Sequence, residues 1–176
     1  MTNYFLIGFM GAGKSTIAAE LVKRTGKKLV EMDAQIVEEQ GMSINDIFAQ
    51  FGEQKFRDIE SDLVKRIANE GNTIVSCGGG VVVRSENTET MKASGKIIFL
   101  TATPETIYNR VKDGNDRPIL NGHMNVEYIA ELMEKRRALY EAAADIRIET
   151  DGKDVGEICD EILEKFADYD VSKLTC

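Results

Sequence analysis

A glycine-rich segment followed by a lysine and two hydroxyl residues lies close to the amino terminus. It runs Gly8-Phe9-Met10-Gly11-Ala12-Gly13-Lys14-Ser15-Thr16 and matches the pattern G-x-x-x-x-G-K-[S/T]. Glycines let successive backbone N–H groups point at phosphate oxygens, and a helix that follows adds its positive N-terminal end. In such loops the lysine reaches the β- and γ-phosphates, and the next hydroxyl ligates Mg²⁺. The segment predicts a nucleoside triphosphate site with Ser15 as metal ligand and these binding residues: Gly11, Ala12, Gly13, Lys14, Ser15 and Thr16.

Other classes of protein with similar loops fit less well. A bare strand-to-helix turn would not need the Lys14-Ser15 pair, and a dinucleotide fingerprint would need a third glycine. Switch GTPases need D-x-x-G and N-K-x-D segments, and the sequence contains neither. A mechanical ATPase needs more chain than 176 residues and a run of acids at the end of a strand. These exclusions leave a small-molecule kinase.

Carboxylates follow the second apolar run of the chain, in Glu31-Met32-Asp33. Alternation along a strand puts Glu31 and Asp33 on the same side of its C-terminal end, where open α/β sheets bind ligands. Asp33 could accept the proton of an acceptor hydroxyl. It could equally be the N-cap of a helix over Ala34 to Glu39, and the sequence leaves both interpretations open.

An arginine borders the apolar stripe of the next predicted helix. The stripe consists of Phe56, Ile59, Leu63, Val64 and Ile67. Arg57 lies beside it, with Glu60 three residues on, so it could be oriented for bidentate capture of a carboxylate. A surface ion pair within the helix is the simpler interpretation of this spacing alone.

Three consecutive glycines, Gly78-Gly79-Gly80, end the third apolar run. A simple bend does not need three, so we expect them to let the backbone approach a ligand closely. Cys77 just before them is interpreted as a small packed residue and not as a nucleophile.

Further arginines lie in the carboxyl-terminal half. Arg117 precedes Pro118 within the least patterned stretch, Lys112 to Asn125, and a loop arginine that closes over phosphates can stabilise transferring charge. Arg136 and Arg137 flank the apolar stripe around Met133 on opposite sides. An arginine near a core needs an anionic partner, so we expect at least one of the two to point into a ligand cleft.

Five short apolar runs must position these residues, with segments long enough for helices between them. This pattern predicts an α/β fold with a parallel sheet covered on both faces. Helix starts are predicted at Thr103-Pro104-Glu105 and at Ser43, which has Asp46 three residues on. The predicted strands are Tyr4 to Ile7, Lys28 to Val30, Thr73 to Ser76, Lys96 to Leu100 and Ile146 to Ile148.

The composition is that of one globular domain. Of the 176 residues 43% are apolar and 30% charged, and the net charge is -8, so no nucleic-acid or membrane partner is expected. The three cysteines, at unpaired spacings, suggest neither disulfides nor a zinc site. No apolar run approaches the roughly 20 residues of a membrane span, and we expect a cytoplasmic protein.

In combination, these motifs resemble shikimate kinase over nearly the whole chain. The resemblance rests on the phosphate loop, Glu31-Met32-Asp33, Gly52-Glu53 with Phe56-Arg57, Gly78-Gly79-Gly80, Arg117-Pro118-Ile119-Leu120 and Arg136-Arg137-Ala138-Leu139-Tyr140. It implies a three-layer α/β/α, nucleoside-monophosphate-kinase-like domain over residues 1–176 with a five-stranded parallel sheet. An acceptor-binding subdomain would span about 34–60 and a lid about 112–125, in a monomer.

The resemblance also implies roles for individual residues. Asp33 would bind the acceptor hydroxyls and serve as base, beside catalytic Lys14 and Arg117. Arg57 and Arg136 would clamp the shikimate carboxylate, alongside Gly78, Gly79 and Gly80. The nucleotide would also contact Arg110, Arg117 and Lys153. Glu31 stands where the family usually has Asp, and Lys153 where it often has Arg.

The reaction implied is transfer of the γ-phosphoryl group of ATP, with Mg²⁺, to the 3-hydroxyl of shikimate. A related kinase of gluconate or of a nucleoside monophosphate is the alternative, but it would not need Arg57, Gly79 and Arg136 as one site. A non-catalytic nucleotide-dependent regulator is a further alternative. The intact Lys14, Ser15, Asp33 and Arg117 argue against it.

Overall fold

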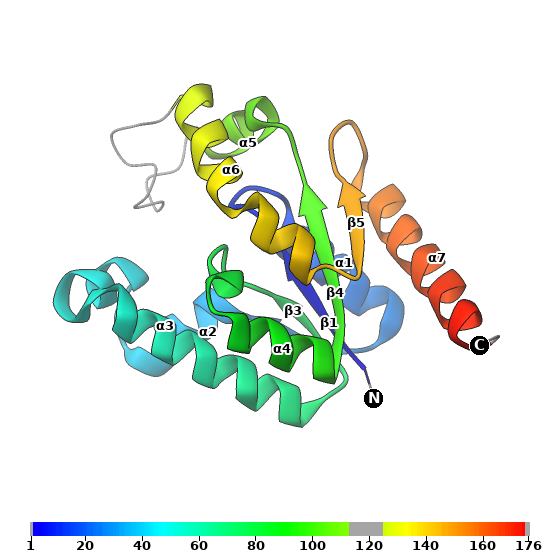
Figure 1. Ribbon diagram of the computed structural model, residues 1–176, viewed down its shortest axis with the longest axis horizontal. Coiled ribbons are helices and arrows are strands. Elements are labelled where there is room, and N and C mark those ends of the chain that lie inside the picture. Colours follow the sequence, from blue (N-terminus) through cyan, green and yellow to red (C-terminus); the bar gives the residue numbers. More distant parts are fainter. Residues whose placement is uncertain (1, 113–124, 175–176) are drawn as a thin grey trace.

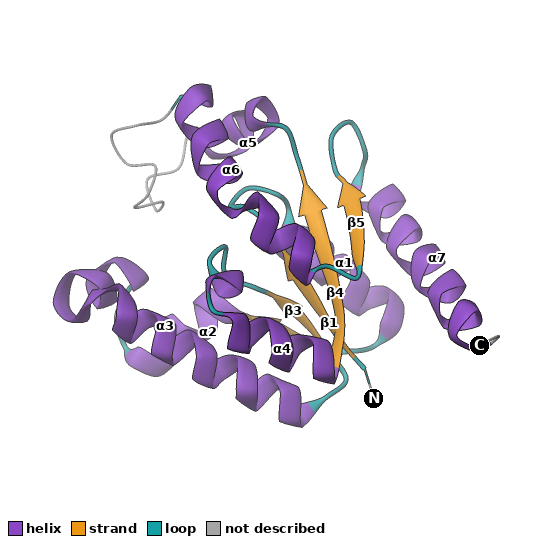
Figure 2. Ribbon diagram, in the orientation of Figure 1, coloured by secondary structure: helices purple, strands orange, loops and turns teal. Residues whose placement is uncertain are grey.

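A parallel sheet of five strands lies in the middle of the molecule (Figures 1 and 2). This computed structural model describes residues 2–112 and 125–174. The strand order is β2-β3-β1-β4-β5, and every neighbouring pair is parallel, as predicted. The strands are β1 (Asn3–Ile7), β2 (Lys28–Glu31), β3 (Thr73–Ser76), β4 (Gly95–Thr101) and β5 (Ile146–Glu149).

Helices cover both faces of this sheet and complete the predicted three layers. Because side chains alternate along a strand, Phe5 faces one layer of core and Leu6 the other. The first layer contains α2, α3, α4 and the carboxyl-terminal end of α6, and the second contains α1, α5, α7 and the amino-terminal part of α6. The helices are α1 (Lys14–Thr25), α2 (Met32–Gln40), α3 (Ile44–Glu70), α4 (Ser85–Ser94), α5 (Pro104–Val111), α6 (Val126–Ala143) and α7 (Val155–Leu174), with a 3-10 turn η1 (Val81–Val83).

The strand order brings chemically important segments to one edge of the sheet. The chain leaves β1 towards β2 on one side and returns through β3 to β4 on the other, so β1 lies at the point where the winding reverses. Ligands of open α/β sheets bind beyond the strand ends at such a point. The loop after β1, the start of α2 after β2 and the glycines after β3 therefore meet there (Figure 1).

Both predicted helix starts are confirmed by side-chain caps. Ser43 accepts a hydrogen bond from the Asp46 N–H at the start of α3, and Thr103 accepts one from the Thr106 N–H at the start of α5. Helix α3 is broken at Gly52, whose φ of 83° and ψ of 169° are not helical. The helical segment with Arg57 and Glu60 begins after this break. No helix within the described ranges is long and apolar enough to cross a bilayer.

Candidate active site

The loop between β1 and α1 is shaped for an anion. Gly8, Gly11 and Gly13 adopt positive φ values of 147°, 79° and 96°, which side chains disfavour. A Cβ on Gly8 would also lie 2.5 Å from the Leu100 carbonyl oxygen. Helix α1 starts directly at Lys14 and has no acidic residue in its first turn. Its N-terminal N–H groups and positive dipole end therefore face the loop without a competing carboxylate.

Lys14 and Ser15 meet partners from three neighbouring segments. The Lys14 Nζ donates to the carbonyls of Gly8, at 2.6 Å, and Phe9, at 3.1 Å, which holds the ammonium over the loop. The Ser15 hydroxyl donates to the Glu31 Oε2 at 2.9 Å and lies 3.3 Å from the Ser76 hydroxyl. Side-chain oxygen atoms from α1, β2 and β3, of the kind that can ligate Mg²⁺, therefore lie next to the phosphate loop.

Asp33 is positioned by α2 and not by the strand before it. Strand β2 ends at Glu31, which is itself the N-cap of α2, so both the alternation argument and the N-cap interpretation of Asp33 are wrong. Asp33 lies in the first helical turn instead. A Cβ on Gly78 would lie 2.8 Å from the Asp33 Oδ1 and 3.0 Å from the Glu60 Oε2, so both carboxylates lie close against this glycine.

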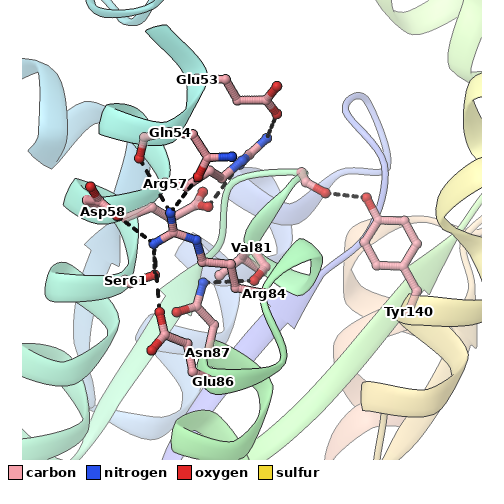
Figure 3. Close-up of polar contacts among 12 residues, drawn as sticks. Glu53, Gln54, Arg57, Asp58, Ser61, Val81, Arg84, Glu86, Asn87 and Tyr140 are labelled. Carbon is pink, nitrogen blue, oxygen red and sulfur yellow. Dashed lines mark hydrogen bonds and ion pairs between the residues drawn. The ribbon is translucent and has the colours of Figure 1, made fainter. Parts of the chain in front are cut away.

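Arg57 and Glu60 form a buried ion pair. The Arg57 Nη1 donates to the Glu60 Oε1 at 2.9 Å, and the two residues are 5% and 0% exposed, so the interpretation as a surface pair is wrong. The Arg57 Nη2 also meets the Glu53 Oε1 at 3.3 Å (Figure 3). Among the described residues, the Arg57 Nε and the Glu60 Oε2 have no hydrogen-bond partner. Buried polar atoms left without partners are costly, and a bound polar ligand would satisfy them.

Burial raises the pKa of Glu60 from 4.5 to about 6. The nearby Arg57 guanidinium opposes the shift, and the Asp33 carboxylate adds to it. Burial also raises the pKa of the Cys77 thiol far above its usual range, so this cysteine stays protonated, in line with its predicted packing role.

Position 80 has no room for a side chain as long as the Arg57 guanidinium keeps its place. A Cβ there would lie 2.6 Å from the Arg57 Cζ, in the space that the guanidinium occupies. We expect Gly80→Ala to push Arg57 aside while the backbone, whose φ is -100°, tolerates the change. The KM for the acceptor should rise about tenfold or more, because displacing a positioning group by an ångström is that costly. Steady-state kinetics should show the KM for ATP unchanged; equal rises in both would contradict this account.

The two adjacent arginines of α6 point in different directions. Arg137 is exposed and pairs with Glu134 at 3.1 Å and Glu141 at 3.3 Å. The Arg136 Nη1 lies 3.6 Å from the place that a Cβ on Gly79 would take, and its charge acts on the pKa of Glu60. Arg136 therefore belongs with the glycines and the buried pair.

Of the remaining predicted residues, Arg110 contacts the phosphate loop, Lys153 pairs with α7, and Arg117 lies outside the described residues. The Arg110 Nη1 donates to the Gly11 carbonyl at 3.0 Å and to the Thr150 hydroxyl at 3.3 Å, which ties α5 to the loop. Lys153 lies beyond β5 and pairs with Glu161 of α7 at 2.7 Å. Arg117 and nearly all of the predicted lid fall within residues 113–124, which the structure does not describe.

Tyr140 is named from the sequence as the last residue of the family motif Arg136-Arg137-Ala138-Leu139-Tyr140, with no role predicted in the site. Its ring stacks on Phe99 with a centroid distance of 5.1 Å, and its hydroxyl donates a hydrogen bond to the Gly79 carbonyl (Figure 3). A buried tyrosine hydroxyl usually has a hydrogen-bond partner, so the presence of a tyrosine next to the apolar stripe could have indicated a polar contact at this position. A cavity of about 370 Å³ lies behind Tyr140, between α6 and the ends of β4 and β5. Of the predicted site residues only Ala12 lines it, so it is separate from the acceptor residues.

Comparisons with known proteins agree with this geometry. The family model described as shikimate kinase matches residues 10–167. A shikimate kinase of Persephonella marina is 44% identical over 163 residues, which are 93% of this chain and 98% of that protein. One of Dehalococcoides mccartyi is 40% identical over 168 residues, 96% of this chain and 95% of that protein.

Solved structures show the same likeness. Shikimate kinase from Acinetobacter baumannii in complex with shikimate superposes with a TM-score of 0.91 at 27% identity, covering 96% of this chain and 94% of that one. A gluconokinase from Sinorhizobium meliloti reaches a TM-score of 0.61 at 17% identity, covering 96% and 93%, and shows the fold alone. With a family model over most of its length and relatives at this level of identity, the chain belongs to the shikimate kinase family.

Proposed function

We propose that the chain transfers the γ-phosphoryl group of ATP to the 3-hydroxyl of shikimate, and that the residues around Gly78–Gly80 hold the acceptor. The observation that carries the proposal is the meeting of a phosphate loop with a buried arginine whose Nε lacks a partner, next to a carboxylate. Shikimate offers a carboxylate to such an arginine and hydroxyls to such a carboxylate. Membership of the family supports this pairing of nucleotide and acceptor.

The nucleotide is assigned to the loop between β1 and α1. The N–H groups of Gly11 to Thr16 bind the phosphates, and Lys14 exchanges its contacts with loop carbonyls for phosphate oxygens. Arg110, already bonded to the Gly11 carbonyl, lies on the nucleotide side, and Lys153 and Arg117 keep their predicted roles there.

Mg²⁺ fits the oxygen donors beside Ser15. Magnesium is bound through one or two carboxylates together with phosphates and water and needs no cage made wholly of protein groups. Ser15 and Glu31, 2.9 Å apart, would hold it and so neutralise charge on the phosphates. The hydrogen bond between Ser15 and Glu31, which stands where the family usually has aspartate, supports a shared role of the two residues in holding the metal.

The acceptor is assigned to residues from α2, α3 and α6. Arg57 and Arg136 bind the carboxylate, with the Gly79 backbone alongside, and Asp33 orients the hydroxyl. In the reaction, a bond forms between the acceptor oxygen and the γ-phosphorus while the bond from that phosphorus to the β–γ bridging oxygen breaks. The hydroxyl proton passes to Asp33, and Lys14 stabilises the charge that develops on the phosphates.

Ser15→Ala tests the metal assignment. Removing one ligand should raise the Mg²⁺ concentration for half-maximal activity about tenfold or more, since changes around metal ligands typically cost 10–100-fold in affinity. A Mg²⁺ titration at saturating ATP and shikimate measures this. Ser85→Ala at the start of α4 is the control, and an unchanged Mg²⁺ dependence in Ser15→Ala would argue against Ser15 as ligand.

Thermal unfolding tests the pair of ligands before any turnover is measured. A ligand that binds only the folded state raises the melting temperature. Shikimate alone and a non-hydrolysable ATP analogue with Mg²⁺ should each stabilise the protein, whereas gluconate and AMP should not match shikimate. Stabilisation by the nucleotide but not by shikimate would leave the nucleotide site standing and overturn the acceptor.

A further inference from the structure

We infer that Arg84 is a positioning residue for the acceptor site, a role that rests on the proposed function of Arg57. Arg84 lies between η1 and α4, four residues after Gly80. Its side chain forms hydrogen bonds to α3, the helix that carries Arg57, and so connects the segment from Gly78 to Arg84 with that helix (Figure 3).

The Arg84 guanidinium makes several polar contacts with one face of α3. The Arg84 Nη1 meets the Asp58 Oδ1 at 2.8 Å and the Ser61 hydroxyl at 3.4 Å. Its Nη2 donates to the Gln54 Oε1 at 3.0 Å and lies 3.5 Å from the Gln54 carbonyl oxygen. A planar guanidinium with several donors can span such a set, which fixes both the distance and the angle of the helix.

The residues that Arg84 holds lie next to those of the buried pair. Residues 54, 58 and 61 repeat with the same helical spacing as 53, 57 and 60, one residue further on, so the two sets form adjacent stripes on α3. The first stripe binds Arg84, and the second is the Glu53–Arg57–Glu60 cluster. Any movement of α3 that loosens one stripe therefore moves the other.

The segment from Gly78 to Asn87, to which Arg84 belongs, is held together by its own hydrogen bonds. The Val81 N–H donates to the Gly78 carbonyl and the Val83 N–H to the Gly80 carbonyl. The buried Asn87 amide donates to the Val81 carbonyl at 3.0 Å, and the Asn87 N–H to the Arg84 carbonyl at 3.2 Å. The glycines, η1 and the start of α4 thus form one hydrogen-bonded unit, to which Arg84 is fixed.

The position of α3 relative to this hydrogen-bonded unit determines where the Arg57 guanidinium lies in the acceptor site. A Cβ at Gly80 would overlap the Arg57 guanidinium, and one at Gly78 would reach the Glu60 carboxylate, so the two elements are in close contact. The break at Gly52 leaves the first turn of this helical segment without a continuous helix before it. Arg84 supplies the missing restraint on the turn that carries Glu53, Gln54 and Arg57.

The test compares Arg84→Ala with Arg24→Ala. Arg24 is a matched control, because its side chain is 28% exposed against 24% for Arg84 and it too joins two helices, through Asp160 of α7. For Arg84→Ala we expect the Kd and KM for shikimate to rise about tenfold, as for a small misplacement of a binding group, with the KM for ATP unchanged. Arg24→Ala should change the melting temperature without changing either KM.

Two further variants separate positioning from stability. Arg84→Lys keeps the charge near Asp58 but loses the planar reach to Gln54, so it should recover only part of the affinity. Gln54→Ala removes a neutral partner and should shift the KM for shikimate in the same direction by a smaller factor. A lower melting temperature with an unchanged KM for shikimate, or equal rises in both KM values, would overturn the inference.

If Arg84→Ala leaves the KM for shikimate unchanged, Arg57→Lys distinguishes a failure of the positioning role of Arg84 from a failure of the acceptor assignment of Arg57. If Arg57→Lys raises the KM for shikimate and Arg84→Ala does not, the acceptor site stands and the positioning role is overturned. If neither variant changes it, the assignment of the acceptor to Arg57 is wrong and the positioning role falls with it.

Discussion

Asp33→Asn is expected to lower kcat by about 10²–10⁴-fold, the range typical for loss of a positioned general base. The amide has almost the same shape as the carboxylate, so it should keep the close packing against Gly78. It cannot accept the proton of the acceptor hydroxyl at neutral pH. Steady-state kinetics should show the KM for ATP near its original value, because the N–H groups assigned to the phosphates belong to the loop after β1 and to α1, whereas Asp33 belongs to α2.

Asp62→Asn is the control for this prediction. Asp62 is an exposed carboxylate on α3, so its neutralisation tests the effect of one lost surface charge. We expect its kcat to be unchanged. If Asp33→Asn behaved like Asp62→Asn, catalysis would not need a carboxylate at the start of α2, and Asp33 would only bind hydroxyls.

Arg57→Met is expected to lower the free energy of unfolding by about 3–5 kcal/mol, because it leaves a buried carboxylate without its partner. The Glu60 side chain is 1% exposed, so water cannot replace the guanidinium. Urea denaturation measures the loss. The acceptor should no longer bind, since the variant lacks the donor assigned to its carboxylate.

The pH dependence identifies the cause of that loss. The folded-state pKa of Glu60 is raised from 4.5 to about 6, so the stability contributed by its neutral form is complete below 4.5 and disappears as the pH rises through about 6. Without Arg57 the carboxylate pKa should rise further. The destabilisation should therefore be large at about pH 8 and smaller at about pH 5.

The double variant Arg57→Met/Glu60→Gln is the matched control. It removes the unpaired charge and should recover most of the lost stability at about pH 8, while shikimate binding stays lost. Equal destabilisation of the single and double variants, independent of pH, would mean that lost packing and not an uncompensated charge is the cause.

The sequence was sufficient where local chemistry decides the structure. The five apolar runs became the five strands, because buried parallel strands need continuous apolar residues. The Ser43 and Thr103 caps formed as predicted, since a cap depends on a few neighbouring atoms. The loop from Gly8 to Gly13 adopted the positive φ values that its glycines allow.

The sequence was insufficient where tertiary contacts decide. Helical spacing placed Glu60 near Arg57, but only the packing of α3 against the glycines shows that the pair is buried. Alternation failed at Asp33 because the strand ends at Glu31, and strand ends are set by the helix that follows. Periodicity could not choose between Arg136 and Arg137, which flank the same stripe. The α3 partners of Arg84 and the glycine partner of Tyr140 lie more than twenty residues away, where no local pattern points to them.

The most direct test of the central claim is ADP formation from Mg-ATP by the purified protein with shikimate, gluconate, AMP or no acceptor. The account predicts turnover with shikimate alone, a product phosphorylated at the 3-hydroxyl, and loss of this turnover in Asp33→Asn. Turnover with gluconate or AMP, or an equal rate without any acceptor, would contradict the assignment of shikimate to the site formed by Asp33, Arg57 and Arg136.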